Sequence, residues 1–282
     1  MSRSLVGFLL SIPVAILGGL IGLGGAEFRL PVLAGPMGHP VQRAVPLNLA
    51  VSLATLATAL LLRSRTLPFS PLLPLVPAVL ALLAGAVTAA FFGASFAHRL
   101  PEARLERVIV VLLVTIGFGL IAEAFLPHGL PALVPASLAW RVPIGLVLGL
   151  GIGLVSSLLG VAGGELIIPT LVFAFGADIR TAGTGSLLIS LPTVLVGVGR
   201  YASLGAFRER KDLRETVLPM SLGSVIGAAI GGILVAYAPQ ATLKVGLGVI
   251  LVVSALKTFT RPARPARRKD TPATPSKQGP RP

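Results

Sequence analysis

Cysteine is absent from the 282 residues, so the chain has no disulfide, no thiolate metal site and no cysteine nucleophile. Histidine is scarce, and the three histidines stand far apart, so we expect neither a histidine metal site nor a cofactor. Charged residues are also few: Asp, Glu, Lys and Arg make up only 12% of the chain, while 54% of the residues are hydrophobic. A soluble domain of this length needs far more charge to cover its surface. The composition therefore excludes an ordinary soluble protein.

The sequence contains six long runs without a charged residue. They cover residues 4–26, 44–62, 66–97, 142–164, 181–199 and 216–243. Each run is long enough to cross about 30 Å of hydrocarbon as a helix, which takes roughly 20 residues. No segment alternates in polarity as a barrel strand does. The sequence therefore predicts an all-α polytopic membrane protein that resides in a lipid bilayer.

One motif occurs twice, 138 positions apart. Gly22–Pro31 reads GLGGAEFRLP and Gly160–Pro169 reads GVAGGELIIP. The identical pairs continue beyond the motif and are Gly22/Gly160, Gly25/Gly163, Glu27/Glu165, Pro31/Pro169, Leu33/Leu171, Gly38/Gly176, Ala44/Ala182, Leu49/Leu187, Ser52/Ser190, Leu53/Leu191 and Thr55/Thr193. A fixed offset of about half the chain indicates an internal duplication.

The apolar runs predict about eight transmembrane helices, four in each repeat. The expected ranges are 5–23, 44–62, 72–97, 106–126, 142–160, 182–200, 214–237 and 241–259. The first transmembrane repeat then covers residues 1–135, the second covers 136–260, and residues 261–282 form a disordered basic cytoplasmic tail. Because four helices return the chain to its starting side, the two repeats are predicted to be parallel, unless each glycine motif folds back as a re-entrant hairpin.

Loop charges predict the orientation of the chain. With the N-terminus inside, the predicted inside segments hold Arg63, Arg65, Arg141 and the basic tail, and they outnumber the outside segments in Lys and Arg. We therefore expect both termini in the cytoplasm and the protein in the inner (plasma) membrane. The tail lacks the aromatic residues and the reading element of a nucleic-acid binder, so no nucleic-acid partner is expected. A homodimer is compatible with the sequence.

Each glycine motif predicts a broken helix, because glycine permits backbone that interrupts a helix and proline removes a donor. Irregular backbone at membrane depth survives only where it is buried in protein or lines a wet cavity. The half-helix that starts near Glu27 or Glu165 points free amides into such a cavity, which favours an anion. Close helix packing through small residues is the alternative, and we prefer it for the glycine rows 145–153 and 223–231.

The two motif acids, Glu27 and Glu165, each have two interpretations. Either acid caps the amides of its half-helix or carries a coupling proton. Arg29 has Ile167 at its matched position, so we expect it to extend to the membrane interface and not to serve as a primary ligand.

A polar face follows each motif. Asn48, Ser52 and Thr55 share one helix face, as do the aligned residues of the second half, and these hydroxyls either bond back to their own helix or line a pathway. The predicted substrate-binding residues are Gly24, Gly25, Ala26, Glu27, Asn48, Ser52, Gly163, Gly164, Glu165, Ser186 and Ser190, with Glu27 and Glu165 as the coupling candidates.

Both motifs, together with the segment PMSLGSVIG at 219–227, resemble the TauE/SafE family of sulfite exporters. The resemblance covers about residues 5–260. Members of the family typically have three consecutive glycines in each motif, whereas this chain has one alanine in each copy, Ala26 and Ala162. The resemblance implies a secondary transporter of small anions such as sulfite, sulfonates or related sulfur oxyanions. No hydrolase, P-loop or dinucleotide motif is present, so we do not expect an enzyme. A membrane scaffold or assembly factor and an uncoupled anion channel remain as alternatives.

Overall fold

The computed structural model of the chain describes residues 3–96, 131–159 and 161–259, together with several positions between 114 and 125. Every regular element in these residues is a helix, which confirms the predicted all-helical class. Six helices are long and apolar enough to cross a membrane, at Arg3–Ile21, Arg43–Thr66, Ser70–Phe92, Leu138–Ser157, Ile179–Ser203 and Arg210–Leu234. The predicted helix at 106–126 and the predicted tail at 261–282 lie largely or wholly outside the described residues. The chain is a multi-pass helical membrane protein.

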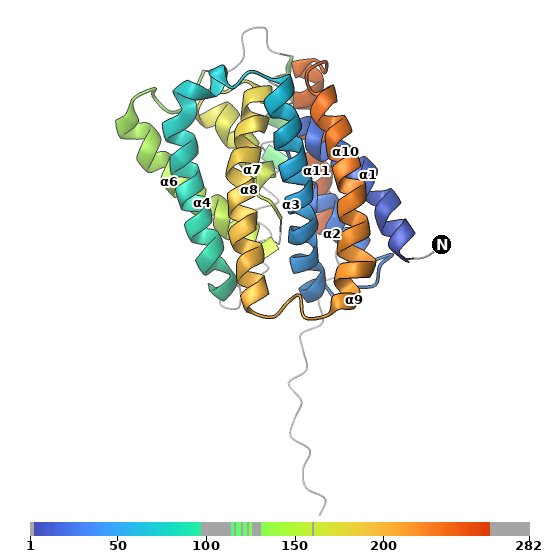
Figure 1. The fold of residues 1–282 in the computed structure, drawn as a ribbon. Helices are drawn as coiled ribbons and strands as arrows, with labels where there is room; N and C mark the ends of the chain where they lie inside the picture. Colours follow the sequence, from blue (N-terminus) through green and yellow to red (C-terminus); the bar gives the residue numbers. More distant parts are fainter. Residues whose placement is uncertain are drawn as a thin grey trace, which may run out of the picture.

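The described helices form one bundle (Figure 1). In chain order they are α1 Arg3–Ile21, α2 Ala26–Ala34, α3 Val41–Thr66, η1 Ser70–Leu75, α4 Val76–Phe96, α6 Leu138–Leu159, α7 Gly164–Pro169, η2 Thr170–Ala174, α8 Ile179–Ser203, α9 Arg210–Asp212, η3 Leu213–Val217, α10 Leu218–Leu234 and α11 Gln240–Phe259. The 3-10 turn η1 leads into α4, while the π-helical turns η2 and η3 continue α7 and lead into α10.

The first glycine motif turns the chain back on itself. Between α1 and α2, Gly25 adopts a left-handed conformation with a φ of 67°. The backbone of Gly25 lies against Val14 of α1, and further along the chain Met37 lies against Gly7. The segment from α2 to Met37 therefore returns along α1, and the motif forms a re-entrant hairpin.

The second motif folds in the same way. Gly163 has a φ of 77° and lies against Ser156 near the end of α6. After α7 and η2 the chain has returned to the segment that precedes α6, where the amide of Val134 donates to the carbonyl of Ala174 at 2.9 Å. Glycine adopts a positive φ at little cost, so Gly25 and Gly163 allow both hairpins to form.

Glycine rows let two pairs of helices pack closely and in the same direction. The row 223–231 of α10 faces Phe8, Ile12 and Ile16 of α1 in that order. The row 145–153 of α6 faces α4 in the same manner, from Ala78 to Ala86. A Cβ atom at any of these glycines would press on the neighbouring helix, so the predicted close packing at both rows is confirmed.

Helices α3 and α8, which the duplication aligns, are antiparallel. Gly183 in the first turns of α8 lies beside Arg63 in the last turn of α3. Near the opposite end of the bundle, Gly197 of α8 lies beside Leu49 of α3. The order of contacts along one helix is thus the reverse of the order along the other.

The directions of α10 and α4 follow from their contacts with α3 and α8. Helix α10 runs with α3, because Thr66 Oγ1 donates to the carbonyl of Gly232 and His39 Nε2 lies 3.0 Å from Thr216 Oγ1. Helix α4 runs with α8, because the side chain of Val79 approaches Gly185 at the start of α8 and Ala90 lines the same small cavity as Thr193.

The prediction of parallel halves is wrong for the described helices. Helices α1, α3 and α10 run in one direction, whereas α4, α6 and α8 run in the other. The aligned pairs α1/α6 and α3/α8 are therefore opposed. The cause is the hairpin at each motif, which brings the chain back so that α3 begins at the end of the bundle where α1 begins.

The positions of several basic residues change accordingly. Arg43 donates to the Glu209 carboxylate and Ser4 Oγ donates to the Glu215 carbonyl, so the starts of α1 and α3 lie beside the α8–α10 connection. This N-terminal end of the bundle holds Arg3, Arg43, Arg200, Arg208, Arg210, Lys211 and Arg214. The opposite end holds Arg63, Arg65, Arg141, Arg180 and Lys244. Arg63, Arg65 and Arg141, predicted to share the side of the N-terminus, thus lie away from it.

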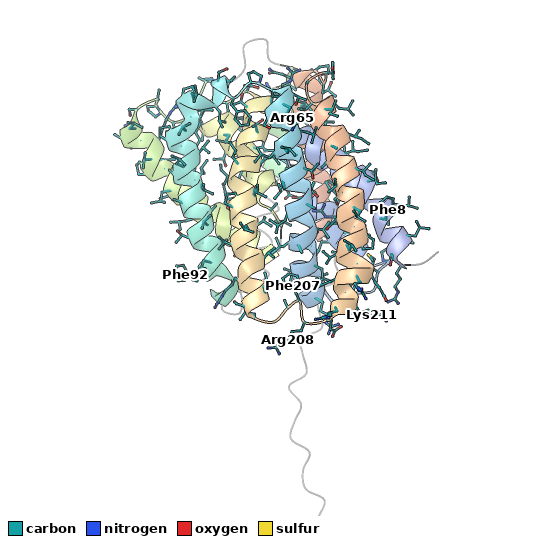
Figure 2. The ribbon with its side chains drawn as sticks, viewed as in Figure 1. Phe8, Arg65, Phe92, Phe207, Arg208 and Lys211 are labelled. Atoms are coloured by element: carbon teal, nitrogen blue, oxygen red, sulfur yellow. The ribbon has the colours of Figure 1, made fainter. Side chains whose placement is uncertain are left out.

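Apolar side chains cover the flank of the bundle between these ends. Figure 2 shows Phe8 and Phe92 on the flank, Arg208 and Lys211 at one end, and Arg65 at the other. Val147 of α6 and Leu222 of α10 are 66% and 54% exposed. Contact with lipid hydrocarbon explains large exposed apolar side chains at these depths.

The corrected helix directions predict that Ser64 and Ser203 lie on opposite sides of the membrane. Both serines are exposed, and the chain has no native cysteine, so Ser64→Cys and Ser203→Cys give clean single-cysteine variants. Because the N-terminal end carries the basic connections, we expect an impermeant thiol reagent to label Ser64→Cys in intact cells and to label Ser203→Cys only after lysis. Equal labelling of both variants from outside would contradict the hairpin topology.

The positive φ of Gly163 predicts a specific sensitivity to alanine. A side chain in the left-handed region costs about 1–2 kcal/mol, so Gly163→Ala is expected to lower the melting temperature of the purified protein and its transport rate. Gly151→Ala in α6 is the matched control, because no atom lies within 4 Å of the added Cβ there and the glycine is helical. A Gly163→Ala protein that melts with or above the control would refute the requirement for a left-handed residue.

Candidate functional site

The two glycine breaks meet each other inside the bundle. A Cβ atom at Gly24 would lie 2.6 Å from Ala162 Cβ, and one at Gly164 would lie 3.1 Å from Leu23 Cδ2. Gly22 is packed against Gly183 of α8 in the same region. The two glycine breaks are therefore packed against each other, and their junction is the candidate site.

Arg29 of α2 lies fully buried beside this junction, with 0% of its surface exposed. Its guanidinium donates to five acceptors, contributed by the first break, α3 and α10. They are Asn48 Oδ1 from Nε at 3.3 Å, Thr55 Oγ1 and Ser224 Oγ from Nη1 at 2.7 and 3.3 Å, and the Gly24 carbonyl and Ser52 Oγ from Nη2, both at 2.6 Å. The guanidinium has five N–H donors, so every donor is used.

All five acceptors are neutral, which leaves the charge of Arg29 without a bonded counter-ion. Among the described residues, the ion pairs are those of Arg43 with Glu209 and Asp212 at the N-terminal end. A buried charge costs several kcal/mol in desolvation unless hydrogen bonds and an opposite charge offset it. The hydrogen bonds of Arg29 are complete, and the carboxyl that acts electrostatically on its charge is that of Glu27, which makes no hydrogen bond to it.

The expectation that Arg29 extends to the membrane interface is wrong. Helix α2 returns through the bundle, and its Arg29 meets the polar face of α3. The spacing of Asn48, Ser52 and Thr55 on one helix face was the available signal, because three neutral acceptors at helical spacing suit a guanidinium. This spacing predicts a polar partner for the α3 face but does not identify Arg29 as that partner.

The hydroxyls of the two halves behave differently. Ser52, Thr55 and Thr193 each donate back to the carbonyl four residues earlier, as the local interpretation predicted. Ser186 and Ser190 are 0% exposed and their hydroxyls have no hydrogen-bond partner. Buried polar groups are nearly always satisfied, so these two hydroxyls are available to an occupant of the site.

Ser186 lies at the junction itself. Its Oγ is 3.1 Å from the position that a Cβ on Gly164 would take, and Ser190 follows one turn later on the same face of α8. Asn48, which aligns with Ser186, instead donates to the Ala26 carbonyl at 2.8 Å and accepts from Arg29. Asn48 and Ser52 of the first half therefore bind Arg29, whereas the hydroxyls of Ser186 and Ser190 at the matched positions have no hydrogen-bond partner.

The two predicted coupling acids also have buried oxygens without a hydrogen-bond partner. Both carboxylate oxygens of Glu27 and Oε1 of Glu165 are buried and accept no hydrogen bond. The N-cap positions of α2 and α7 are Gly25 and Gly163, and neither helix has a side-chain cap. The Glu27 carboxyl does interact with its own backbone amide at the start of α2, so the capping interpretation of this acid stays a prediction.

Arg63 is a second fully buried arginine, which the sequence placed in a loop. It donates to the carbonyls of Gly19 and Leu20 in the last turn of α1, and to Arg180 and Thr184 of α8. Helix ends leave carbonyls without intrahelical partners, so this side chain stabilises the broken end of α1. The aligned position holds Tyr201, so the duplication contained no signal for it.

The described residues include no group of three or more His, Asp or Glu side chains that could hold a metal ion. The junction instead offers the buried charge of Arg29, the two free hydroxyls of Ser186 and Ser190, and carboxyl oxygens of Glu27 and Glu165 that have no hydrogen-bond partner. Its chemistry suits a small anion and a proton.

Comparison with known proteins gives one match. The family described as Sulfite exporter TauE/SafE matches residues 5–258, which include both glycine motifs. No curated protein and no solved structure matches the chain significantly. A match over nearly the whole chain establishes the family, whose members are membrane transporters of sulfur anions. The chain belongs to the sulfite exporter TauE/SafE family.

Proposed function

We propose that this chain is a secondary transporter that moves a small sulfur oxyanion, such as sulfite or a short sulfonate, through the junction of its two glycine breaks. The observation that carries the proposal is the charge of Arg29, buried among five neutral acceptors without a bonded carboxylate. When Glu27 is protonated, an anion at the junction supplies the opposite charge and offsets part of the desolvation cost of the guanidinium.

Arg29 acts on the anion mainly through its charge, because its N–H donors are already used. Its Nη2 binds the Gly24 carbonyl, and Gly24 touches Ala162 across the junction. Only the Gly24 peptide therefore separates the guanidinium of Arg29 from Ala162 of the second half. At such range in a low-dielectric interior, attraction between unlike charges is strong.

Direct ligands come from the open half of the junction. The free hydroxyls of Ser186 and Ser190 are the proposed donors to the anion, and Ser186 lies beside Gly164 at the second break. Amides at Gly25, Ala26 and Gly163 complete the proposed set, with Asn48 and Ser52 holding Arg29 in place. A pyramidal or tetrahedral oxyanion has enough acceptor oxygens to use several such donors at once.

Glu27 and Glu165 are the proposed carriers of a coupling proton. Glu27 stands two residues from Arg29 and its oxygens are unpartnered. When Glu27 is ionised it offsets the charge of Arg29, and when it is protonated the positive charge is free to attract an anion. Proton and anion therefore favour each other at the junction, which is the linkage that a proton-coupled carrier needs.

The opposed helices suggest how access alternates. We infer two repeats, 1–135 and 136–260, inverted about an axis in the membrane plane, as in other carriers with broken helices at the substrate site. We propose that the protein lies in the inner membrane with its more basic N-terminal end facing the cytoplasm. The tail at 261–282 is proposed to lie on the same side. In a scaffold, or in a channel without coupling, unpartnered acids beside a buried arginine have no evident use.

Replacing Arg29 tests the proposal directly. Arg29→Met removes the charge at similar volume, and we expect the flux of the transported anion into proteoliposomes to fall roughly tenfold or more, which corresponds to about 1.4 kcal/mol or more. The measurement uses a panel of sulfite, sulfate, thiosulfate and short sulfonates. Arg65→Met is the control, because it also removes one arginine charge but at an exposed position. Arg65 lies in the last turn of α3, the helix whose polar face binds Arg29. Wild-type flux in a well-folded Arg29→Met protein would exclude this site, and absence of flux for the whole panel with wild-type protein would favour a scaffold.

The acids are tested by glutamine variants. Glu27→Gln and Glu165→Gln keep the shape of the side chain but cannot release a proton. If either acid carries the coupling proton, its variant is expected to lose net flux driven by a proton gradient while still exchanging labelled for unlabelled anion. Net flux and exchange are measured side by side across pH 5–8. Proton-driven net flux that persists in both variants would reject coupling at these acids and favour an uncoupled pathway.

A further inference from the structure

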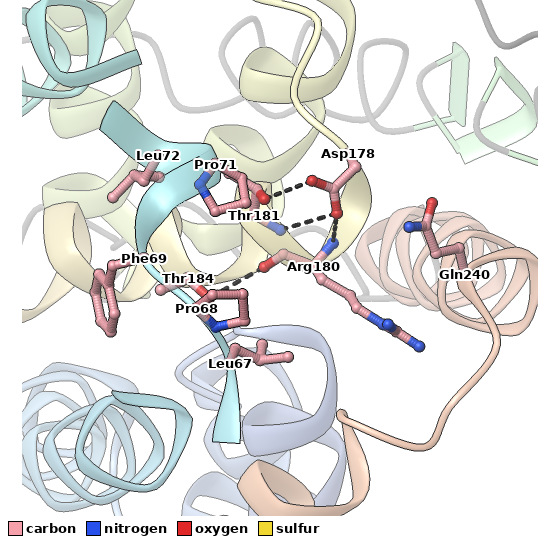
Figure 3. A pocket seen from close by; sticks show the side chains of 10 residues that line it. All are labelled: Leu67, Pro68, Phe69, Pro71, Leu72, Asp178, Arg180, Thr181, Thr184 and Gln240. Carbon is pink, nitrogen blue, oxygen red and sulfur yellow. Dashed lines mark hydrogen bonds between the residues drawn. The ribbon is translucent and has the colours of Figure 1, made fainter. Parts of the chain in front are cut away.

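Two adjacent hollows open at the end of the bundle opposite the N-terminus. They lie where α3 ends and where α8 and α11 begin, and they share Pro71, Asp178 and Thr181. Figure 3 shows the residues that line one of them. Their volumes are about 180 and 230 Å³. One water needs about 10–15 Å³ by the same measure, so a partly hydrated oxyanion has room in either hollow.

The one acid that lines these hollows is already engaged. Asp178 Oδ1 accepts from the backbone amides of Arg180 and Thr181 at 3.0 and 3.2 Å, and Oδ2 accepts from the Thr181 hydroxyl. Asp178 is thereby the N-cap of α8. Figure 3 shows its carboxylate turned toward Thr181, with the Arg180 guanidinium pointing away from it.

Two arginines line the hollows without a carboxylate partner in the described part of the chain. Arg141 lines the larger hollow and donates through Nη1 to the Pro74 carbonyl at 2.9 Å. Arg180 lines the smaller one and donates through Nη2 to the Ala238 carbonyl at 2.7 Å. These bonds hold each guanidinium at the wall but leave its charge unbalanced.

A third guanidinium lies under the floor of the smaller hollow. Thr184 lines that hollow, and its Oγ1 accepts from Nη1 of the fully buried Arg63 at 3.3 Å. Arg63 also binds the carbonyls of Gly19 and Leu20 at the end of α1. The floor of the hollow therefore borders the first glycine break, next to the central junction.

From these contacts we propose that the two hollows form a second anion-binding site, a vestibule that holds a small oxyanion at Arg141 and Arg180 beside the junction. The inference rests on the proposed function for the identity of the anion. A confined region of one charge sign raises the local concentration of the opposite ion, and the effect weakens as salt is added. The vestibule thus acts on capture of the anion, whereas Arg29 acts on its passage.

Gln240→Glu tests the vestibule without removing a positive charge. Gln240 is exposed and is the first residue of α11, where an acid is compatible with the helix. The probe is ³⁵S-labelled sulfite, bound at equilibrium to the purified full chain in detergent at low salt. We expect Gln240→Glu to weaken binding several-fold, and Arg141→Gln and Arg180→Gln to do the same. In proteoliposomes the variants are expected to raise KM at unchanged kcat, with the difference shrinking at high salt.

The matched control is Ser64→Glu, which adds the same charge at the same end outside both hollows. Sulfite binding that is unchanged in Gln240→Glu, or that falls equally in Ser64→Glu, would overturn the vestibule. Failure of the wild-type chain to bind sulfite would overturn it as well. If the vestibule variants weaken binding while the wild-type protein transports no anion of the panel, the vestibule stands and the proposed transport function fails.

Discussion

A backbone that breaks inside a membrane must find its hydrogen-bond partners in protein, because hydrocarbon offers none. Here the two breaks pack against each other, with Gly24 beside Ala162 and Gly164 beside Leu23. The carbonyls left at the end of α1 are bound by Arg63, and the Gly24 carbonyl is bound by Arg29. Both arginines are therefore held in the interior by the need to satisfy broken backbone, and the positive charge of the interior follows from that need.

The duplicated halves use matched positions for different chemistry. In the first half, the polar face of α3 is occupied by Arg29. In the second half, position 167 is isoleucine, and the hydroxyls of Ser186 and Ser190 are left without partners. The junction therefore lies between a half that holds a buried charge and a half whose hydroxyls have no hydrogen-bond partner.

Glycine serves two separate purposes in this bundle. The rows 145–153 and 223–231 bring α6 against α4 and α10 against α1, where any side chain would collide with backbone. Gly25 and Gly163 instead allow a left-handed turn. The alanines at 26 and 162, which replace a third motif glycine, lie beside these turns at negative φ, so they are compatible with the hairpins.

The amino-acid sequence alone determined the helical membrane class, most helix positions, the duplication and the residues that break each helix, because these depend on apolar runs and local backbone preferences. It also indicated the glycine rows and the polar faces through helical spacing. Only the tertiary structure decided that each motif folds back, that the aligned helices are opposed, and that Arg29 and Arg63 are buried. The physical reason is that a turn and a re-entrant hairpin have the same local sequence requirements. Whether a charged residue faces lipid headgroups or neutral acceptors depends on which helix passes beside it, and that neighbour is distant in the sequence.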